Sequence, residues 1–118
     1  MPFIQVISNQ TLTEEQTLTL KARMGKAITQ MPGKSEQWLM VHIRDGEKLF
    51  FAGSGEPCAM VQVRSFGGEQ PAESYDALTA EITQACTACL AVPPDRCYVA
   101  YDATVHWGWN GKNFPVRR

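Results

Sequence analysis

The order strand, helix, strand occurs twice along this chain, and this duplication restricts the folds open to it. Two stretches, at 13–31 and 71–92, carry apolar residues at spacings of three and four, which is typical of helices that bury one face. Strand-like runs flank these stretches at 2–8, 36–44, 57–66 and 95–102. Right-handed crossovers within each β-α-β unit place both helices on one face of a four-stranded mixed sheet. The sequence therefore predicts an α+β fold built from a duplicated unit.

The ends of the two helical stretches carry the expected local signals. Thr13 and Gln16 have the spacing of a capping box, and Gly25 weakens the first helix without ending it. Pro71 suits the first turn of the second helix, and Pro93 lies beyond its end. The residues expected to face the core are Leu20, Met24, Ala27, Ile28 and Met31 on the first helix, and Tyr75, Leu78, Ile82, Ala85, Cys86 and Cys89 on the second. Each helix is therefore expected to bury one stripe.

The face of the sheet away from the helices also needs a partner. The segments WLMVHI at 38–43 and CAMVQV at 58–63 are too apolar for a face open to water, where polar and apolar residues should alternate. Oligomerisation is the simplest explanation, because partner subunits bury what a two-layer monomer leaves exposed. Between the two halves, residues 45–57 read as a turn, a short apolar run and a glycine-rich loop.

Length and charge exclude several classes of protein. A chain of 118 residues with a net charge of -1 is expected to form a single domain over residues 1–118, with no basic stripe for nucleic acid and no membrane signature. The first twenty residues do not resemble a signal peptide, so we expect a cytoplasmic protein, with non-classical secretion left open. Its four cysteines are then interpreted as buried thiols and the sequon at Asn9 as irrelevant. The basic tail at 115–118 is expected to be solvated.

Several apparent motifs fail on inspection. The stretch GSGEPC at 53–58 lacks the third glycine of a dinucleotide fingerprint and leads into a strand. His42 and His106 have neither metal-ligand spacing nor a serine and acid for a hydrolase triad, so no metal site is expected. Asp95 and Arg96 are interpreted as making turn and capping contacts.

A family resemblance emerges from the order of five short motifs. They are Met1-Pro2 at the start, GK at 33–34, GSGEPCA at 53–59, PPDRCY at 93–98 and WGWNGKNF at 107–114. Together with the duplicated β-α-β order, they make the chain resemble the macrophage migration inhibitory factor family of the tautomerase superfamily over nearly its whole length. The resemblance implies a homotrimer whose three sheets line a central barrel, with active sites at the subunit interfaces.

The resemblance also gives a role to Pro2. On its own, a proline at the first position of a strand is ordinary, because its ring is tolerated there. Family members lose the initiator methionine and use the exposed proline nitrogen as a catalytic base, and the small residue after Met1 suits that removal. A free α-amine titrates at roughly 7.7–8.0, and an apolar pocket or a nearby cation lowers this pKa toward neutrality. With Met1 attached, the nitrogen would be an amide and no base.

The implied reaction is the keto–enol tautomerisation of an α-keto acid such as phenylpyruvate. No external cofactor is needed. Lys34 matches the family lysine that meets the carboxylate or carbonyl oxygen of the substrate, where a cation stabilises developing negative charge. A solvated lysine in a turn is the alternative interpretation of Lys34.

Four further residues match positions that contact substrate in the family. Phe66 corresponds to an apolar residue at the pocket, and Tyr98 to an aromatic residue that a neighbouring subunit contributes. Trp38 and Trp109 correspond to aromatics near the pocket mouth, which suits an aromatic substrate. For all four, ordinary packing in the strand or core remains the alternative.

The sequence departs from the family pattern in two places. Ala100 stands where close members carry an asparagine that binds substrate, which puts substrate preference and catalytic strength in question. Cys58 lacks the second cysteine of the Cys-x-x-Cys motif of the mammalian cytokines. A cytokine-like interaction module with a vestigial pocket and an uncertain receptor partner is therefore a second hypothesis. A thiol oxidoreductase using Cys86 and Cys89 is a third, although both lie on the apolar stripe near a helix C-terminus.

Overall fold

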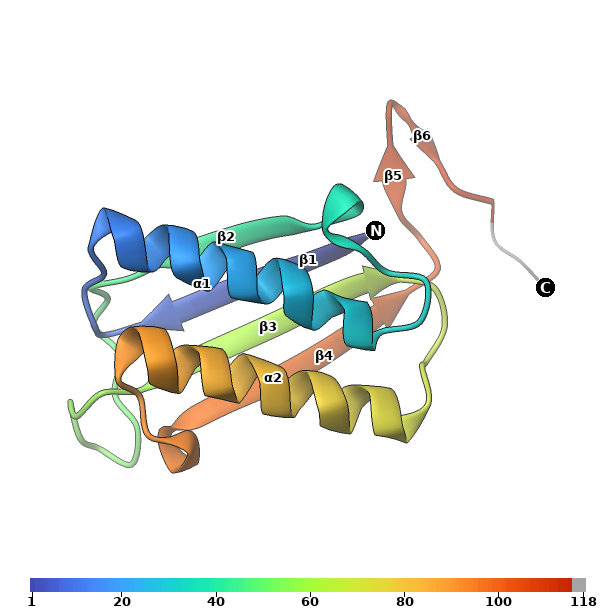
Figure 1. Ribbon diagram of the computed structural model, residues 1–118. Helices are drawn as coiled ribbons and strands as arrows, with labels where there is room; N and C mark the ends of the chain where they lie inside the picture. The colour runs from blue at the N-terminus through green and yellow to red at the C-terminus, as the bar shows by residue number, and fades with distance from the viewer. Residues whose placement is uncertain (116–118) are drawn as a thin grey trace.

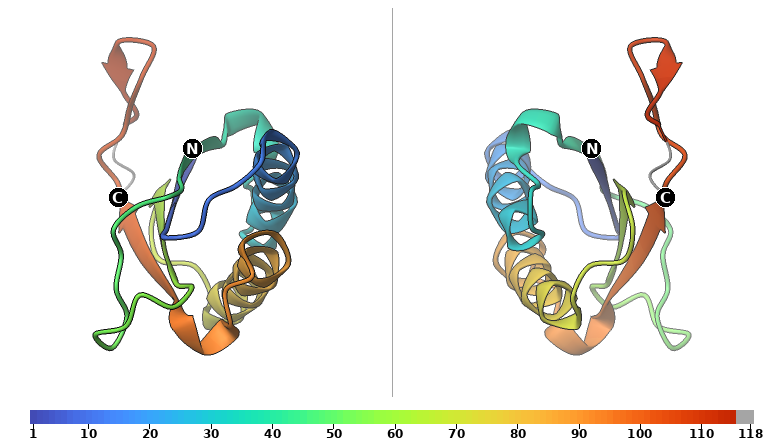
Figure 2. Two further views of the ribbon diagram at one scale, coloured as in Figure 1. Left: turned by 90° about the vertical axis from the view of Figure 1, so that its left-hand side faces the viewer. Right: turned by 90° about the vertical axis from the view of Figure 1, so that its right-hand side faces the viewer.

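The computed structural model describes residues 1–115; residues 116–118, the end of the basic tail, lie outside the described part. Two helices pack side by side on one face of a four-stranded sheet, and a small hairpin projects from the sheet side (Figures 1 and 2). The strands of the sheet are β1 (Pro2–Ser8), β2 (Met40–Arg44), β3 (Ala59–Phe66) and β4 (Cys97–Thr104). The helices are α1 (Glu14–Ala27) and α2 (Ala72–Leu90), and the hairpin pairs β5 (Gly108–Trp109) with β6 (Lys112–Asn113). None of these described helices is long and apolar enough to cross a membrane.

The strand pairing confirms the duplicated unit. The order across the sheet is β2-β1-β3-β4, with β1 parallel to β2, β3 parallel to β4, and β1 antiparallel to β3. Each parallel pair is thus the product of one strand-helix-strand crossover, and the two units join along β1 and β3. The predicted mixed sheet with both helices on one face is confirmed.

Helix α1 begins as the sequence predicts. The Gln16 backbone N–H donates to Thr13 Oγ1 at 3.1 Å, and the Thr13 N–H donates to Gln16 Oε1 at 2.9 Å, which completes a reciprocal capping box. Gly25 lies within the helix. A 3-10 turn at Ile28–Gln30 ends this segment, and all five residues of the predicted stripe are buried.

We expect Thr13→Ala to lower the free energy of unfolding by about 1 kcal/mol, the usual cost of losing an N-cap side chain. Thr19→Ala is the matched control, because its hydroxyl donates to the Glu15 carbonyl within the helix and alanine is the better helix former. The midpoint of urea unfolding at one fixed protein concentration measures both. Equal midpoints for the two variants would contradict the role of the cap.

Helix α2 differs slightly from its prediction at both ends. Pro71 is the N-cap and not part of the first turn, since its ψ of 145° is still extended. Ala91 ends the helix in the left-handed conformation at φ 56°, and its N–H donates to the Thr87 carbonyl at 3.1 Å. Of the predicted stripe, Tyr75 is half-buried and the other five residues are buried, so the stripe faces the sheet.

The sheet alternates more regularly than the sequence suggests. Along β3, Ala59, Val61, Val63 and Ser65 are buried against the helices, whereas Met60, Gln62, Arg64 and Phe66 lie on the open face. The open face of β3 is therefore mixed, and the prediction that the segment 58–63 is too apolar to be open to water is wrong for this strand, whereas the segment 38–43 does expose Trp38 and Met40. The apolar residues of the segment 58–63 lie mostly at core-facing positions, because successive side chains of a strand point to opposite faces of the sheet.

The strand-like runs at 36–44 and 95–102 are shorter as strands than predicted. Glu36–Trp38 and Pro94–Arg96 are 3-10 turns that precede β2 and β4. Arg96 lies in the second turn, where its guanidinium donates to four carbonyls of residues 51–57 and stacks over the Phe51 ring at 5.2 Å. The predicted turn contacts of Arg96 are confirmed, and they fix the loop that joins the two halves.

Candidate active site

The N-terminus is fixed at one end of the central strand pair. Pro2 begins β1 with its side chain buried, and it lies opposite Ser65 of β3. The Phe66 backbone N–H donates to the Met1 carbonyl at 3.1 Å. A proline has no backbone N–H for the ladder, so its place at the first position costs the sheet nothing. The nitrogen of residue 2 is thereby positioned by the register of the sheet.

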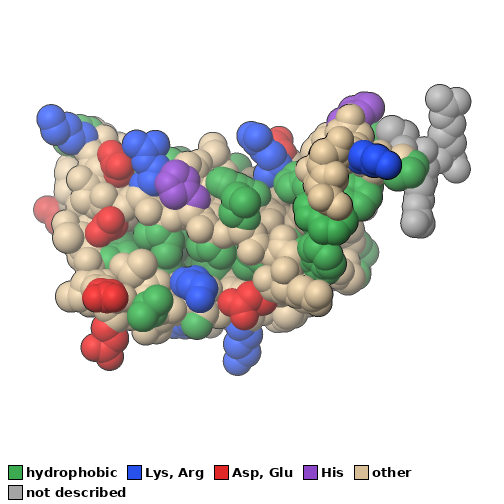
Figure 3. All heavy atoms as spheres, turned by 90° about the horizontal axis from the view of Figure 1, so that it is seen from above, with side chains coloured by type: hydrophobic (Ala, Val, Ile, Leu, Met, Phe, Trp, Pro, Cys, Tyr) green, Lys and Arg blue, Asp and Glu red, His purple; other side chains and the backbone are tan. Residues whose placement is uncertain are grey.

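Pro2 lines a pocket of about 410 Å³ together with two of the predicted aromatics, Trp38 and Trp109. The two indoles meet edge to face with their centroids 5.4 Å apart. Trp38 comes from the 3-10 turn before β2 and Trp109 from β5, so segments far apart in sequence form the wall. Seen from above, hydrophobic side chains gather where the hairpin meets the body of the molecule (Figure 3).

Lys34 and Phe66 lie together in a second hollow of about 790 Å³, lined also by Gly33, Gly67 and Gly68. The Lys34 ammonium donates to the Phe66 carbonyl at 2.7 Å, so this lysine has a fixed partner and is half-buried. The Phe66 ring stacks on Phe114 at 4.9 Å. The interpretation of Lys34 as a freely solvated turn residue is therefore excluded.

Met1 lines the Pro2 pocket near Lys34, and the titration of its α-amine indicates the electrostatics of this end of the molecule. The α-amine lies close enough to Lys34 for the lysine to affect its pKa. Burial, together with the smaller effects of the charge and hydrogen bonding of Lys34, lowers the pKa of this amine from 8.0 to about 6. This end of the molecule thus favours an uncharged amine at neutral pH.

Tyr98 lies away from the other predicted site residues. It stands beside Met60 near the start of β3 and β4, while Pro2 pairs with Ser65. Five residues along β3 separate the two positions by roughly 17 Å, at about 3.3 Å per residue. Tyr98 is 61% exposed and contacts Phe51, with the ring centroids 5.0 Å apart. Within one chain, Pro2, Trp38 and Trp109 come together, Lys34 and Phe66 lie next to them, and Tyr98 does not join.

Sequence reasoning missed two aromatics at this end of the molecule. Trp107 lines the Pro2 pocket. Phe114 stacks between Phe66 and Trp109, and the ring centroids of Phe114 and Trp109 lie 6.3 Å apart. Both are placed by the β5–β6 hairpin, whose turn residues Asn110 and Gly111 have φ of 54° and 79°. The dipeptide Asn-Gly is a strong hairpin signal and would have predicted this turn.

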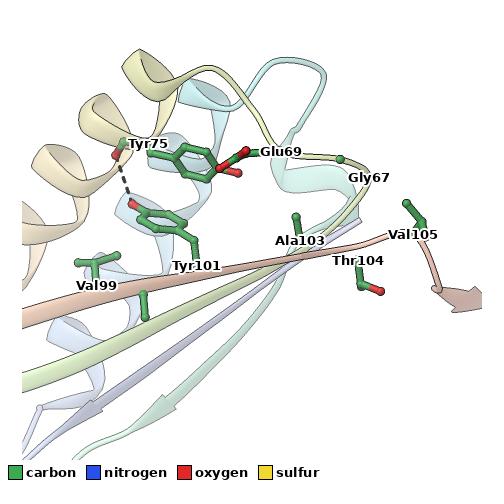
Figure 4. Close-up of a pocket in the computed structure, with 10 residues that line it drawn as sticks. Gly67, Glu69, Tyr75, Val99, Tyr101, Ala103, Thr104 and Val105 are labelled. Carbon is green, nitrogen blue, oxygen red and sulfur yellow. Dashed lines mark hydrogen bonds between the residues drawn. The ribbon is translucent and has the colours of Figure 1, made fainter.

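A third hollow of about 740 Å³ runs along the outer edge of β4. Tyr75 of α2 and Tyr101 of β4 lie side by side there, with Glu69 beside Tyr75 (Figure 4). The Tyr101 hydroxyl shares a hydrogen bond of 2.6 Å with Thr79 and donates to the Tyr75 carbonyl at 3.4 Å. Burial raises the pKa of Tyr101 above its usual value. This hollow adjoins the Lys34 hollow through Gly67 and Gly68.

The thiols give no support to redox chemistry at Cys86 and Cys89. Both are buried and free, as predicted. A hydrogen bond between the Cys86 and Cys97 thiols raises the pKa of Cys86 and lowers that of Cys97. In residues 1–115, no group of three or more histidine, cysteine or carboxylate side chains is arranged to hold a metal ion.

A proline at position 2, set in a pocket at the end of a duplicated β-α-β sheet, fits the class that the sequence resembles, the tautomerases. The family model described as "Macrophage migration inhibitory factor (MIF)" matches residues 1–115. Macrophage migration inhibitory factor from Xenopus laevis is 30% identical over 100 residues, which cover 81% of this chain and 84% of that protein. The crystal structure of Leishmania major MIF2 is 36% identical with a TM-score of 0.88, and covers 97% of each chain.

A homologue from Prochlorococcus marinus, 23% identical, shares the fold with a TM-score of 0.85 over 96% of this chain and 99% of that one. The chain belongs to the macrophage migration inhibitory factor family, within the tautomerase superfamily. Membership supports an isomerase of the tautomerase type or a cytokine-like role.

Proposed function

We propose that this protein is a keto–enol tautomerase for α-keto acids such as phenylpyruvate, with Pro2 as the general base after Met1 is removed. The observation that carries the proposal is the lowered pKa, about 6, of the α-amine at this end of the molecule. A base is most effective when its pKa lies near the working pH. Removal of Met1 exposes the imino nitrogen of Pro2 one residue further into the same apolar surroundings.

The chemistry follows from the positions of two groups. The Pro2 nitrogen takes a proton from the carbon beside the carbonyl, the electron pair of that C–H bond forms the enol double bond, and negative charge develops on the carbonyl oxygen. The Lys34 ammonium, held at 2.7 Å from the Phe66 carbonyl, stabilises that charge or the neighbouring carboxylate. Pro2 then returns the proton to that oxygen, which gives the neutral enol and restores the base. No external cofactor takes part.

The surrounding side chains favour an aromatic or apolar substrate body. Trp38 and Trp109 form one wall of the Pro2 pocket, and Phe66 lies beside Lys34. Their rings bury the substrate and exclude water from the reacting atoms, which strengthens the effect of the Lys34 charge.

We propose that the protein assembles as a homotrimer in which Tyr98 of one subunit reaches the Pro2 pocket of a neighbour. Three features of the single chain support this assembly. Tyr98 is 61% exposed, Met40 on the open face is 69% exposed, and β4 is an edge strand with one unpaired side. Edge strands and exposed large apolar side chains are common sites of association.

A cytokine-like role with a weakened pocket is the second candidate. It is favoured by Ala100, which is exposed on β4 and offers no polar side chain where related proteins carry an asparagine. Loss of one hydrogen bond to substrate lowers binding but leaves Pro2 and Lys34 in place, so we rank the tautomerase first.

The pH dependence of phenylpyruvate tautomerisation tests the proposal, using protein whose intact mass shows that Met1 is lost. Pro2 acts only when unprotonated, so kcat/KM should rise with pH and level off once the imino group is neutral. Because the site lowers the pKa of an α-amine from 8.0 to about 6, we expect the plateau by roughly pH 7, about two units below where an ordinary amine of pKa 7.7–8.0 would reach it. No detectable activity at any pH would reject the tautomerase and leave the cytokine-like role.

A further inference from the structure

Arg64 lies in a hollow that continues the Pro2 pocket across the open face of the sheet. This hollow, of about 350 Å³, is lined by Arg64 and by Gln5 and Gln62. It shares Phe3, Met40 and Trp107 with the Pro2 pocket, so the two are contiguous. The register explains this, because Met40, Phe3 and Arg64 are direct neighbours across β2, β1 and β3.

The charge of Arg64 is not neutralised within the described chain. The only ion pair in residues 1–115 joins Arg44 and Glu47 at 3.3 Å. Asp102 of β4 is the register partner of Arg64, yet the two side chains form no ion pair there. Arg64 itself is exposed, and its side chain makes no hydrogen bond to the part of the chain that the structure describes, so its guanidinium is available to a ligand in this hollow.

A second cation, Lys34, comes from the loop between the two 3-10 turns before β2 and contacts the end of β3. Lys34 donates to the carbonyl of Phe66, which is two residues beyond Arg64. Residues two apart on a strand share a face and lie about 6.6 Å apart. The end of β1 that carries Pro2 is therefore flanked by a lysine and an arginine. An arginine binds a carboxylate through two parallel hydrogen bonds, which gives it selectivity as well as affinity.

We propose that Arg64 binds a second carboxylate of the substrate, so that the natural substrates are α-keto dicarboxylic acids. The inference rests on the proposed tautomerase function and assigns its substrate class. Lys34 engages the oxygens at the keto end, Pro2 moves the proton, and Arg64 holds the far carboxylate beside Trp107. The reaction itself is unchanged, since the second carboxylate takes no part in bond making.

A matched pair of substrates isolates this contact. 2-Oxoglutarate and 2-oxopentanoate have the same carbon chain and differ only in the terminal carboxylate. Exchange of their C3 protons with deuterium oxide, followed by proton NMR, measures enolisation of both. We expect Arg64→Gln to lower the ratio of kcat/KM for 2-oxoglutarate over 2-oxopentanoate by about tenfold to hundredfold, the size of a lost charge-assisted hydrogen-bond pair. Arg64→Lys should recover part of the ratio.

Arg44→Gln is the control, because Arg44 lies on the open face of β2 away from this hollow and should leave the ratio unchanged. An equal effect of Arg64→Gln on both substrates, or no effect, would overturn the proposal. If neither substrate exchanges while phenylpyruvate is still turned over, the dicarboxylate proposal is overturned and the tautomerase stands. If phenylpyruvate is not turned over either, the tautomerase proposal fails, and glutarate binding followed by tryptophan fluorescence decides the role of Arg64. Weaker glutarate binding by Arg64→Gln than by the parent then supports the carboxylate site, and equal binding overturns it.

Discussion

Insertion of one alanine between Met1 and Pro2 is expected to lower kcat/KM for phenylpyruvate by about 10²- to 10⁴-fold, the contribution of a positioned general base. After Met1 is removed, the added alanine carries the free amine, and the Pro2 nitrogen stays a peptide amide without basicity. The new amine lies about one residue, roughly 3.3 Å, from the position that Pro2 would occupy. Displacements of this size disrupt proton transfer, which requires contact distances.

The control for this insertion is Pro2→Ala, which also permits removal of Met1 but keeps a free α-amine at position 2. It should lose less activity than the insertion, because the amine remains in the same surroundings. Unfolding midpoints of both variants show whether β1 keeps its pairing with β3. An insertion variant as active as the parent would refute Pro2 as the base.

Replacement of Lys34 by methionine should lower kcat/KM for phenylpyruvate by about 10²- to 10³-fold, as found when one oxyanion-stabilising donor is removed. Methionine keeps the apolar stem of the side chain but neither donates to the Phe66 carbonyl nor carries charge. Lys48→Met is the matched control, because Lys48 is exposed and lines none of the hollows around Pro2. It should keep activity within about twofold, as surface substitutions usually do.

The Lys34 variant also carries a signature that a purely structural role would not produce. The positive charge of Lys34 disfavours protonation of the neighbouring amine and so lowers its pKa. Without that charge the pKa of the amine rises, and the acidic limb of the pH profile should move to higher pH. Burial, the larger cause of the lowered pKa, remains, so the movement should be partial. An unchanged profile with lost activity would argue that Lys34 acts only by packing.

Features encoded in neighbouring residues could be predicted. The capping box of Thr13 and Gln16, the bounds of β1 and the interior position of Gly25 depend on contacts within one or two turns or along one strand. The hairpin at 108–113 was equally local, and its Asn-Gly turn went unused in the prediction. The order strand, helix, strand then fixes the sheet, because few connections between such units are possible.

The composition of the site was decided only by the tertiary structure. The register of β1 with β3 makes Arg64 a neighbour of Phe3. The path of the hairpin then brings Trp107 to the same hollow as these two residues. A shift of one residue in the strand register would move the Arg64 side chain to the helix face of the sheet. Its role therefore cannot be predicted from the neighbouring residues in the sequence. Sequence alone supplied the residue types that this chemistry needs. Long-range pairing decided which of them share a pocket, because that outcome depends on the packing of segments about thirty or more residues apart.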